Sequence, residues 1–313
     1  MRFFDPLVAA SLLAASYTFV QGAAVSSDGA GSSPLQRRLT SSLKKETDFL
    51  GQPTKAVMYT YVPSSYKKGN PLVLALHHCQ GTGPSYFGEY PWGQAADQKG
   101  FMMIFPSSPY ENGTCWDVAS NAALRHDGGS DPQTVANMVK FATNKYGSGK
   151  NYVTGHSSGA MLTELMAAEY ADLFVAGAEY SGVPATCFAT GKPIGQDWNP
   201  TCAQGKYNET IQYWVQKAKS TYSGYSGQYP RMMLVHGTAD TTINFNNQRE
   251  AIKQWTGLHD LDPSKPTKTE SLPGQSNYQI TYYGGNTVMA IAAGGVTHDN
   301  PAKVDLTCQF FGI

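Results

Sequence analysis

The stretch Val153-Thr154-Gly155-His156-Ser157-Ser158-Gly159 places a serine between two glycines in the pattern G-x-S-x-G. A strand-like segment precedes this pattern and a helical segment follows it. In a nucleophile elbow the chain turns sharply at the serine, and a glycine two residues away on either side removes a Cβ atom that would collide with the strand or the helix. The pattern in this context predicts that Ser157 is a nucleophile, with Ser158 as the rival hydroxyl. The alternative is a glycine-rich turn without chemistry.

Apolar segments on both sides of the elbow alternate between the periods of strands and of helices. A continuous apolar run such as 71–76 is typical of a buried parallel strand, and the apolar spacing of 132–146 indicates a helix. The order of segments predicts an α/β fold in which helices cover both faces of a mostly parallel sheet. We expect strands at 56–62, 71–76, 101–105, 151–154, 173–180, 232–235, 278–283 and 287–291, and helices at 93–99, 132–146, 161–170 and 248–256.

A serine hydroxyl is a weak nucleophile at neutral pH, so an imidazole must take its proton and a carboxylate must orient the imidazole. In a sheet of this type the chain order is serine, acid, histidine, which leaves His259 and His298 as candidate bases. His298 follows a predicted strand and the flexible pair Gly294-Gly295, where a loop can reach over the strand ends. His259 stands just beyond a predicted surface helix. We therefore expect His298 to be the base.

Asp240 is the candidate acid, because it follows the predicted core strand 232–235 in the sequence His236-Gly237-Thr238-Ala239-Asp240. An Asx turn explains an aspartate at this place equally well, and such a turn is compatible with catalysis. The competing aspartates are less well placed, since they adjoin His298 or lie in a polar surface loop: Asp299, Asp260 and Asp262.

A third junction, Leu76-His77-His78-Cys79-Gln80-Gly81-Thr82-Gly83, follows the strongest early strand. A turn here can point a backbone N–H at the oxyanion, and we assign this donor to Cys79 or Gln80. The N–H of Ser158, directly after the nucleophile, supplies the second donor. The two adjacent histidines point to opposite faces of a strand, so one ion cannot easily bind both, and no metal site is predicted.

Composition and the N-terminus bear on where the protein acts. Lys plus Arg and Asp plus Glu number 23 each, so no net charge attracts a nucleic acid or an anionic membrane. The apolar run 7–20 suits the core of a signal peptide and is short for a membrane span. We expect a signal peptide at 1–24, a disordered or pro-like leader at 25–45 and one catalytic domain at 46–313. We expect the mature protein to be a secreted, extracellular monomer.

Secretion would place the five cysteines in an oxidising compartment. Any of them can be the odd one, and the other four pair in three ways, so spacing alone leaves the connectivity open. We expect Cys79–Cys115, which would tie the oxyanion turn to the loop beside Trp116, and Cys187–Cys202, leaving Cys308 free. Two sequons are usable for glycosylation if they are exposed, at Asn112 and Asn208.

Six motifs complete the pattern: H-x-C-x-G-T (77–82), S-P-Y-x-x-G-T-C-W-D (108–117), V-T-G-x-S-S-G-A-M (153–161), Y-S-G-V-x-A-x-C-F (180–188), W-N-x-T-C-A-Q-G (198–205) and H-G-x-x-D-T-T (236–242). Together they resemble secreted acetylxylan esterases of carbohydrate esterase family one, related to feruloyl esterases and polyhydroxybutyrate depolymerases. The resemblance implies the α/β-hydrolase fold, the triad Ser157, Asp240 and His298, and an oxyanion donor at Cys79.

The activity expected from this resemblance is removal of acetyl groups from xylan through an acyl-enzyme, a mechanism that requires no cofactor. Aromatic side chains would supply flat surfaces for pyranose rings, although such residues serve packing equally often: Trp116, Trp198, Tyr86 and Tyr110. A feruloyl esterase or a polyester depolymerase is the nearer alternative. A secreted binding protein on an inactive hydrolase scaffold is the more distant one.

Overall fold

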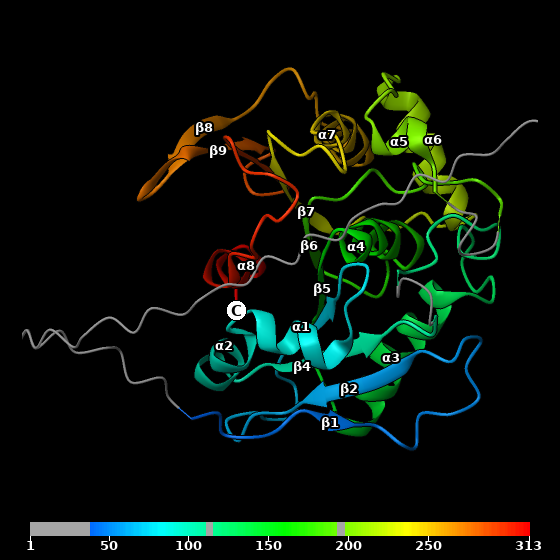
Figure 1. The fold of residues 1–313 in the computed structure, drawn as a ribbon, viewed down its shortest axis with the longest axis vertical. Coiled ribbons are helices and arrows are strands. Elements are labelled where there is room, and N and C mark those ends of the chain that lie inside the picture. Colours follow the sequence, from blue (N-terminus) through cyan, green and yellow to red (C-terminus); the bar gives the residue numbers. More distant parts are fainter. Residues whose placement is uncertain (1–37, 111–114, 193–197) are drawn as a thin grey trace, which may run out of the picture. The chain divides into compact units, whose positions relative to one another are not determined.

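The computed structural model describes residues 38–110, 115–192 and 198–313. Within these ranges the strands form one ten-stranded sheet of order β1-β2-β4-β3-β5-β6-β7-β10-β9-β8 (Figure 1). The strands are β1 (Lys44–Lys45), β2 (Val57–Tyr61), β3 (Leu72–Leu76), β4 (Met102–Ser107), β5 (Asn151–His156), β6 (Ala176–Tyr180), β7 (Arg231–Gly237), β8 (Lys268–Leu272), β9 (Gln275–Tyr283) and β10 (Val288–Ala293).

The centre of the sheet is parallel and its two edges are antiparallel. Strands β4, β3, β5, β6, β7 and β10 pair parallel in that order. Strands β2 and β1 extend the β4 edge antiparallel, and β9 and β8 extend the β10 edge in the same way. Every residue of β3 and β5 is buried, as expected for parallel strands covered on both faces. The prediction of a mostly parallel α/β sheet is confirmed.

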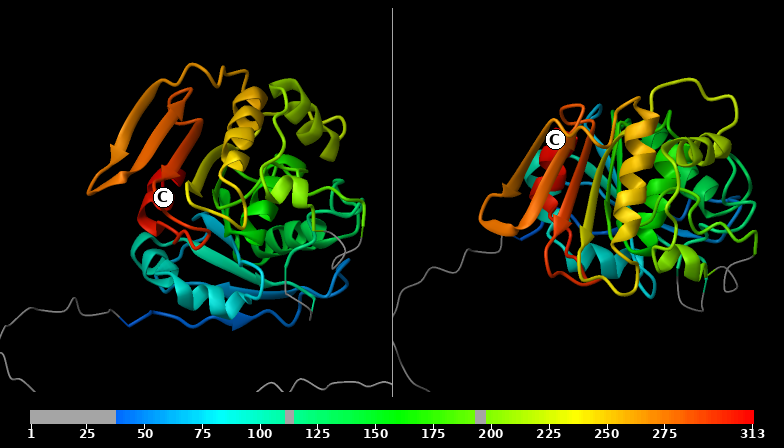
Figure 2. Two further views of the ribbon diagram at one scale, coloured as in Figure 1. Left: turned by 45° about the horizontal axis from the view of Figure 1, so that its top comes forward. Right: turned by 90° about the horizontal axis from the view of Figure 1, so that it is seen from above.

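Helices cover both faces of this sheet, as Figure 2 shows. Alternate residues of β3 enter different clusters, because neighbouring side chains of a strand point to opposite faces. Leu74 packs with side chains of α3 and α4, whereas Val73 packs with those of α1, α2 and α8. The helices are α1 (Gly83–Glu89), α2 (Trp92–Lys99), α3 (Asp131–Tyr146), α4 (Ser158–Glu169), α5 (Pro200–Ala203), α6 (Ile211–Thr221), α7 (Asn246–Leu258) and α8 (Val304–Phe311).

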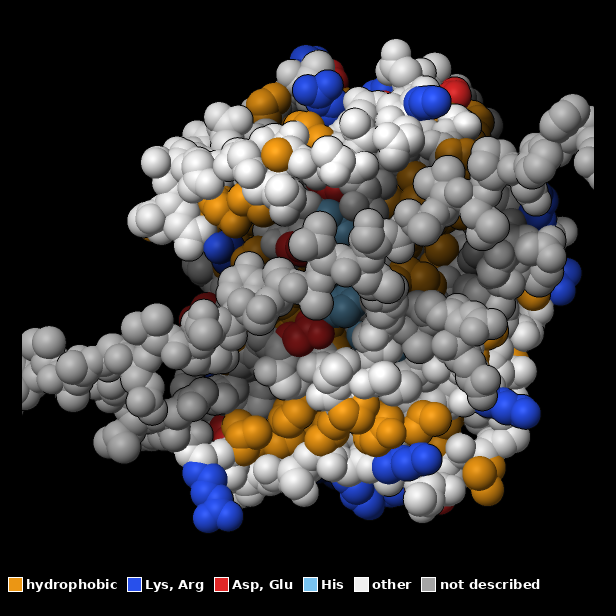
Figure 3. All heavy atoms as spheres, in the orientation of Figure 1, with side chains coloured by type: hydrophobic (Ala, Val, Ile, Leu, Met, Phe, Trp, Pro, Cys, Tyr) orange, Lys and Arg blue, Asp and Glu red, His pale blue; other side chains and the backbone are white. Residues whose placement is uncertain are grey.

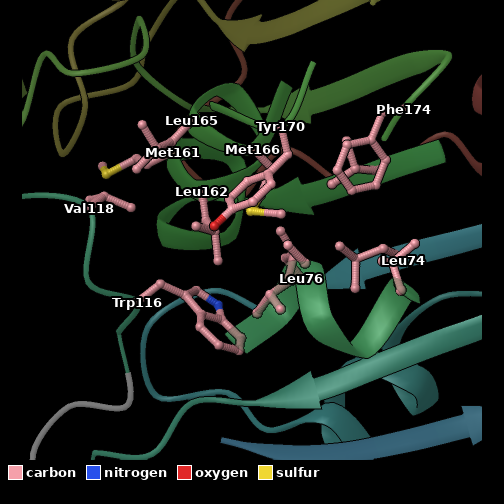
Figure 4. Packing of buried hydrophobic residues seen from close by; sticks show 14 of the residues in the cluster. Leu74, Leu76, Trp116, Val118, Met161, Leu162, Leu165, Met166, Tyr170 and Phe174 are labelled. Carbon is pink, nitrogen blue, oxygen red and sulfur yellow. The ribbon is translucent and has the colours of Figure 1, made fainter. Parts of the chain in front are cut away.

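Helix α4 is the helix that fixes the elbow. It follows β5 directly, and each of its residues is buried, so it has no solvent face. Figure 4 shows Leu162 and Met166 of α4 close to Leu74 and Leu76 of β3. A helix buried on all sides is held by tertiary packing rather than by amphipathic patterning. Its first residue therefore has a defined place at the centre of the sheet.

The structure corrects two boundaries. Residues 38–45 belong to the compact unit Arg38–Ile313, so the expectation of a disordered leader is wrong for these residues. Thr40 donates a hydrogen bond of 2.5 Å to Asp97, Leu39 packs on the α2 side of the sheet, and β1 pairs with β2. Helix α4 begins at Ser158 rather than at residue 161. In the described ranges no helix is both long and apolar enough to cross a membrane.

Candidate active site

Ser157 occupies the sharp turn between β5 and α4. Its backbone has φ +56° and ψ −118°, in a region that L-residues rarely adopt. A Cβ atom on Gly155 would lie 2.3 Å from the carbonyl oxygen of Gly159, and one on Gly159 would lie 2.1 Å from that of Leu76. Both glycines are therefore required for the strand and the helix to approach each other. This turn presents the side chain of Ser157 at the carboxyl end of β5.

His298 lies beside Ser157 although 141 residues separate them. The distance from His298 Nε2 to Ser157 Oγ is 2.8 Å, and that from His298 Nδ1 to Asp240 Oδ2 is also 2.8 Å. The structure thus brings together the three residues expected to form a triad. His259 instead places its Nε2 3.0 Å from the carbonyl oxygen of Pro230 and does not line the cavity around Ser157.

Asp240 is held as a carboxylate by a set of donors. Its Oδ1 accepts hydrogen bonds from the backbone N–H groups of Thr242 and Ile243, at 2.9 and 2.8 Å. Burial alone would raise the pKa of Asp240, but hydrogen bonds from His236, His298 and Ile243 outweigh this effect and lower the pKa below its ordinary value. The Asx turn and the contact with His298 occur together, each using a different oxygen.

His236 is a neighbour of the acid that sequence reasoning did not single out. Its ring is fully buried, with Nε2 2.8 Å from the carbonyl oxygen of Ile243 and 3.3 Å from Asp240 Oδ2. A carbonyl oxygen only accepts, so Nε2 carries the hydrogen. Its position four residues before the acid in the H-G-x-x-D motif was the available signal.

The loop that carries His298 is anchored through its main chain. His156, which precedes the nucleophile, donates from Nε2 to the carbonyl oxygen of His298 at 3.0 Å, and Ser181 Oγ donates to the same oxygen at 3.3 Å. Burial lowers the pKa of His156 to about 4, so its ring is neutral at physiological pH. His156, at the first unspecified position of the G-x-S-x-G pattern, therefore has a structural role.

The expected oxyanion donors lie around the same serine. Cys79 and Gln80 form a turn just beyond β3, and Gln80 has a positive φ of 63°. Ser158 is the first residue of α4, where a backbone N–H has no acceptor within its own helix. All three residues line the cavity next to Ser157. The geometry is compatible with donors at Ser158 and at either residue of the turn.

These groups line a cavity of about 680 Å³. Figure 3 shows a hollow near the centre of this face in which histidine, acidic and apolar side chains meet. The lining residues are His78, Cys79, Gln80, Glu89, Tyr90, Cys115, Trp116, Val118, His156, Ser157, Ser158, Met161, Phe188, Trp198, Thr242, Ile243, His298, Asp299 and Pro301.

The four aromatic candidates fall into different environments. Trp198 lines the cavity with 54% of its surface exposed, and its ring meets that of Phe188 edge to face at 5.1 Å. Trp116 also lines the cavity but is 1% exposed, and its indole N–H donates to the carbonyl oxygen of His77. The expectation for Tyr86 is wrong, because this residue of α1 is fully buried and its ring offers no face to a ligand. Tyr110 is half-buried and lies outside the cavity lining.

Both expected disulfides are present, Cys79–Cys115 and Cys187–Cys202, and Cys308 is a buried free thiol. The side chain of Asn208 is exposed and accepts a hydrogen bond from Lys253 Nζ at 3.2 Å, whereas Asn112 lies outside the described residues. The segment 1–24, predicted to be a signal peptide, lies outside them as well. In the same described part of the chain, no group of three or more His, Cys, Asp or Glu side chains is arranged to hold a metal ion.

Comparisons with known proteins agree with this geometry. Residues 92–260 match the Prolyl oligopeptidase family. Acetylxylan esterase A of Aspergillus awamori is 46% identical over 273 residues, which cover 87% of this chain and 89% of that protein. The chain belongs to the acetylxylan esterase A family. Acetylxylan esterase A of Aspergillus ficuum, with 45% identity and the same coverage, is a further relative.

A solved structure extends the relationship to three dimensions. The acetyl xylan esterase from Aspergillus awamori matches with a TM-score of 0.83 and 45% identity, covering 87% of this chain and 99% of that one. The fold of this member of the acetylxylan esterase A family is thus the α/β-hydrolase fold that its motifs imply.

Proposed function

We propose that the protein is a secreted serine esterase that removes acetyl groups from xylan. The observation that carries this proposal is the hydrogen-bonded series Ser157–His298–Asp240, of which Ser157 and His298 line the cavity, in a chain of the acetylxylan esterase A family. A carboxylate, an imidazole and a serine in this arrangement are the parts that acyl transfer requires.

The chain's own residues account for each step. His298 Nε2 takes the proton of Ser157 Oγ as this oxygen attacks the ester carbonyl, and Asp240 stabilises the imidazolium that results. The N–H of Ser158 and an N–H of the Cys79-Gln80 turn stabilise the oxyanion. His298 returns the proton to the sugar oxygen as the carbon–oxygen bond breaks. Water then repeats the sequence on the acyl-enzyme and frees acetate.

The lining of the cavity supports an ester that combines a small acyl group with a sugar. Met161, Val118 and Phe188 supply apolar surface near Ser157 that suits the methyl group of acetate. The exposed ring of Trp198 offers a flat apolar face of the kind on which a pyranose ring packs. Trp116 supports the wall from below this surface rather than contacting the sugar with an open face.

The covalent chemistry supports an extracellular place of action. Two disulfides support folding in an oxidising compartment, which agrees with secretion. The exposed Asn208 in its sequon is the site where a glycan would be attached in that route. We propose that the enzyme acts as a monomer on acetylated xylan or its oligosaccharides outside the cell.

The test is product release from a xylan that carries both acetyl and feruloyl groups. The purified protein should release acetate in large excess over ferulate, and the Ser157→Ala variant should release neither. Ferulate as the main product would favour the feruloyl esterase alternative, and neither product from the wild-type protein would contradict the proposal.

A further inference from the structure

The cavity has a polar wall that the acyl-transfer mechanism does not use. His78 follows β3, Glu89 ends α1 and Asp299 follows the base, and all three line the cavity. None of them belongs to the series Ser157–His298–Asp240. They come from elements other than the segment after β6 that carries Phe188 and Trp198. The cavity therefore combines an apolar wall with a wall of hydrogen-bonding groups.

Glu89 is fixed by His78. The distance from His78 Nε2 to Glu89 Oε1 is 3.0 Å, and His78 Nδ1 lies 2.6 Å from the carbonyl oxygen of Cys79. The side chains of this pair are 30% and 33% exposed, so they are partly in contact with solvent at the cavity. In the described part of the chain Oε2 of Glu89 has no hydrogen-bond partner. One carboxylate oxygen thus remains free to accept a hydrogen bond from a ligand.

Tyr90, which follows Glu89 directly in the chain, lines the cavity together with Glu89 and Asp299. Burial raises the pKa of the Tyr90 hydroxyl, and the negative charges of Glu89 and Asp299 raise it further. Both carboxylates are therefore within electrostatic reach of one phenol ring. Since β3, α1 and the loop after β10 all contribute to this wall, its position relative to Ser157 is set by the sheet.

An acetylated sugar differs from a simple acetate ester by the free hydroxyls of its leaving group. A hydroxyl next to the ester oxygen is a donor that needs an acceptor when it enters a cavity, because a buried polar group without a partner is unfavourable. A carboxylate is a strong acceptor for such a donor. The free oxygen of Glu89 meets this requirement in the cavity that Ser157 also lines.

We propose that Glu89, held in place by His78, is a specificity-determining residue that accepts a hydrogen bond from the sugar hydroxyl adjacent to the acetylated position. This assignment rests on the proposed esterase function and deepens it. Glu89 selects esters of vicinal diols over esters whose alcohol carries no second hydroxyl. Asp299 and Tyr90 line the same cavity and add further polar groups to it.

The experiment compares two substrates that differ by one hydroxyl, cyclohexyl acetate and trans-2-hydroxycyclohexyl acetate. The wild-type enzyme should show a higher kcat/KM for the hydroxyl-bearing ester. Glu89→Gln should lower this selectivity ratio about tenfold or more, the effect of losing a charged hydrogen-bond acceptor. The matched control is Glu270→Gln, which removes a carboxylate of the edge strand β8 that pairs with Lys268 outside the cavity. It should leave the ratio unchanged.

The outcomes separate this inference from the proposed function. If Glu89 only braced the Cys79 turn through His78, Glu89→Gln would lower kcat/KM for both esters by the same factor and leave the ratio intact, which would overturn the assignment. Acetate release from xylan by the wild-type protein is measured in parallel. If the wild-type protein releases no acetate from xylan but its selectivity between the two esters depends on Glu89, xylan is refuted as the substrate and the role of Glu89 stands.

Discussion

The elbow at Ser157 and the loop that carries His298 place two reacting groups 2.8 Å apart by different means. The elbow is local, since β5, two glycines and a fully buried helix fix it within a short stretch of chain. The loop at His298 is held by groups from three other places in the sequence: Asp240, His156 and Ser181. A local pattern defines the nucleophile, whereas long-range contacts define the base.

The elbow and the loop also differ in the interactions that hold them in place. The positive φ of Ser157 costs about 1–3 kcal/mol, which the packing of the all-buried helix α4 offsets. The His298 loop has no comparable packing, and its side chain is 18% exposed. Its position therefore depends on individual hydrogen bonds. Substituting Ser157 at the elbow should therefore abolish turnover. Substituting a residue that supports the loop should lower kcat/KM only partly.

The largest effect is expected at the elbow itself. Ser157→Ala removes one hydroxyl from a residue that is 9% exposed, so the protein should fold normally. Turnover should fall by roughly three to six orders of magnitude, because the acyl-enzyme can no longer form. Acetate release and circular dichroism of the same preparation measure the two properties. Substantial hydrolysis by the pure variant would transfer the nucleophile to another group.

The base provides a comparison within the loop. His298→Ala should lower kcat by roughly three orders of magnitude or more, because no other imidazole among the described residues hydrogen-bonds to Ser157 Oγ. His259→Ala is the matched control, since this ring bonds to the carbonyl oxygen of Pro230 outside the cavity. Its activity should stay close to that of the wild type. Equal losses in the two variants would show that the base has been misassigned.

A smaller effect is expected where the elbow supports the loop. His156→Ala removes the Nε2 donor to the His298 carbonyl oxygen and should lower kcat/KM up to about tenfold. His156→Gln, which keeps an N–H donor, should recover part of the loss. His126→Ala is the control, because this histidine contacts the carbonyl oxygen of Glu169 away from the cavity. A His156→Ala enzyme with wild-type kcat/KM would mean that the loop needs no such anchor.

The smallest effect concerns the buried helix and is seen only in stability. Burial raises the pKa of Glu169 in α4 to about 9, above its value of 4.5 when unfolded, so the folded protein keeps this carboxyl protonated. Its contribution to stability is present below the unfolded pKa and is lost as the pH rises toward 9. The unfolding temperature of the Glu169→Gln variant should therefore fall less than that of the wild type as the pH is raised from about 5 to about 8. Identical pH profiles for the two proteins would contradict a protonated Glu169.

Local signals predicted the fold and the elbow well. The parallel strands are continuous apolar runs in the sequence. The pattern G-x-S-x-G at a strand end is specific for a nucleophile elbow because both glycines are sterically required. His298 and Asp240 were reached through chain order and position after strands, without any signal for their mutual distance. The supporting roles of His156 and His236 depend on contacts between distant segments, which no periodicity encodes.

The aromatic residues show where sequence alone fails. Tyr86 and Trp198 have similar apolar surfaces, yet Tyr86 of α1 is fully buried and Trp198 is 54% exposed at the cavity. The difference arises from α1, a short helix that the apolar pattern did not indicate, whose capping box at Thr82 and Ser85 starts it just after the oxyanion turn. Burial of a single ring follows from such tertiary placement rather than from residue type.

The central claim is that Ser157, activated by His298, forms the acyl-enzyme. The most direct measurement treats the protein with a serine-reactive organophosphate and locates the adduct by peptide fragmentation, while residual acetate release is followed. We predict one adduct, on Ser157 and not on Ser158, with activity falling in proportion to labelling and no labelling in the His298→Ala variant. An adduct on Ser158, or full activity in protein labelled at Ser157, would contradict the account.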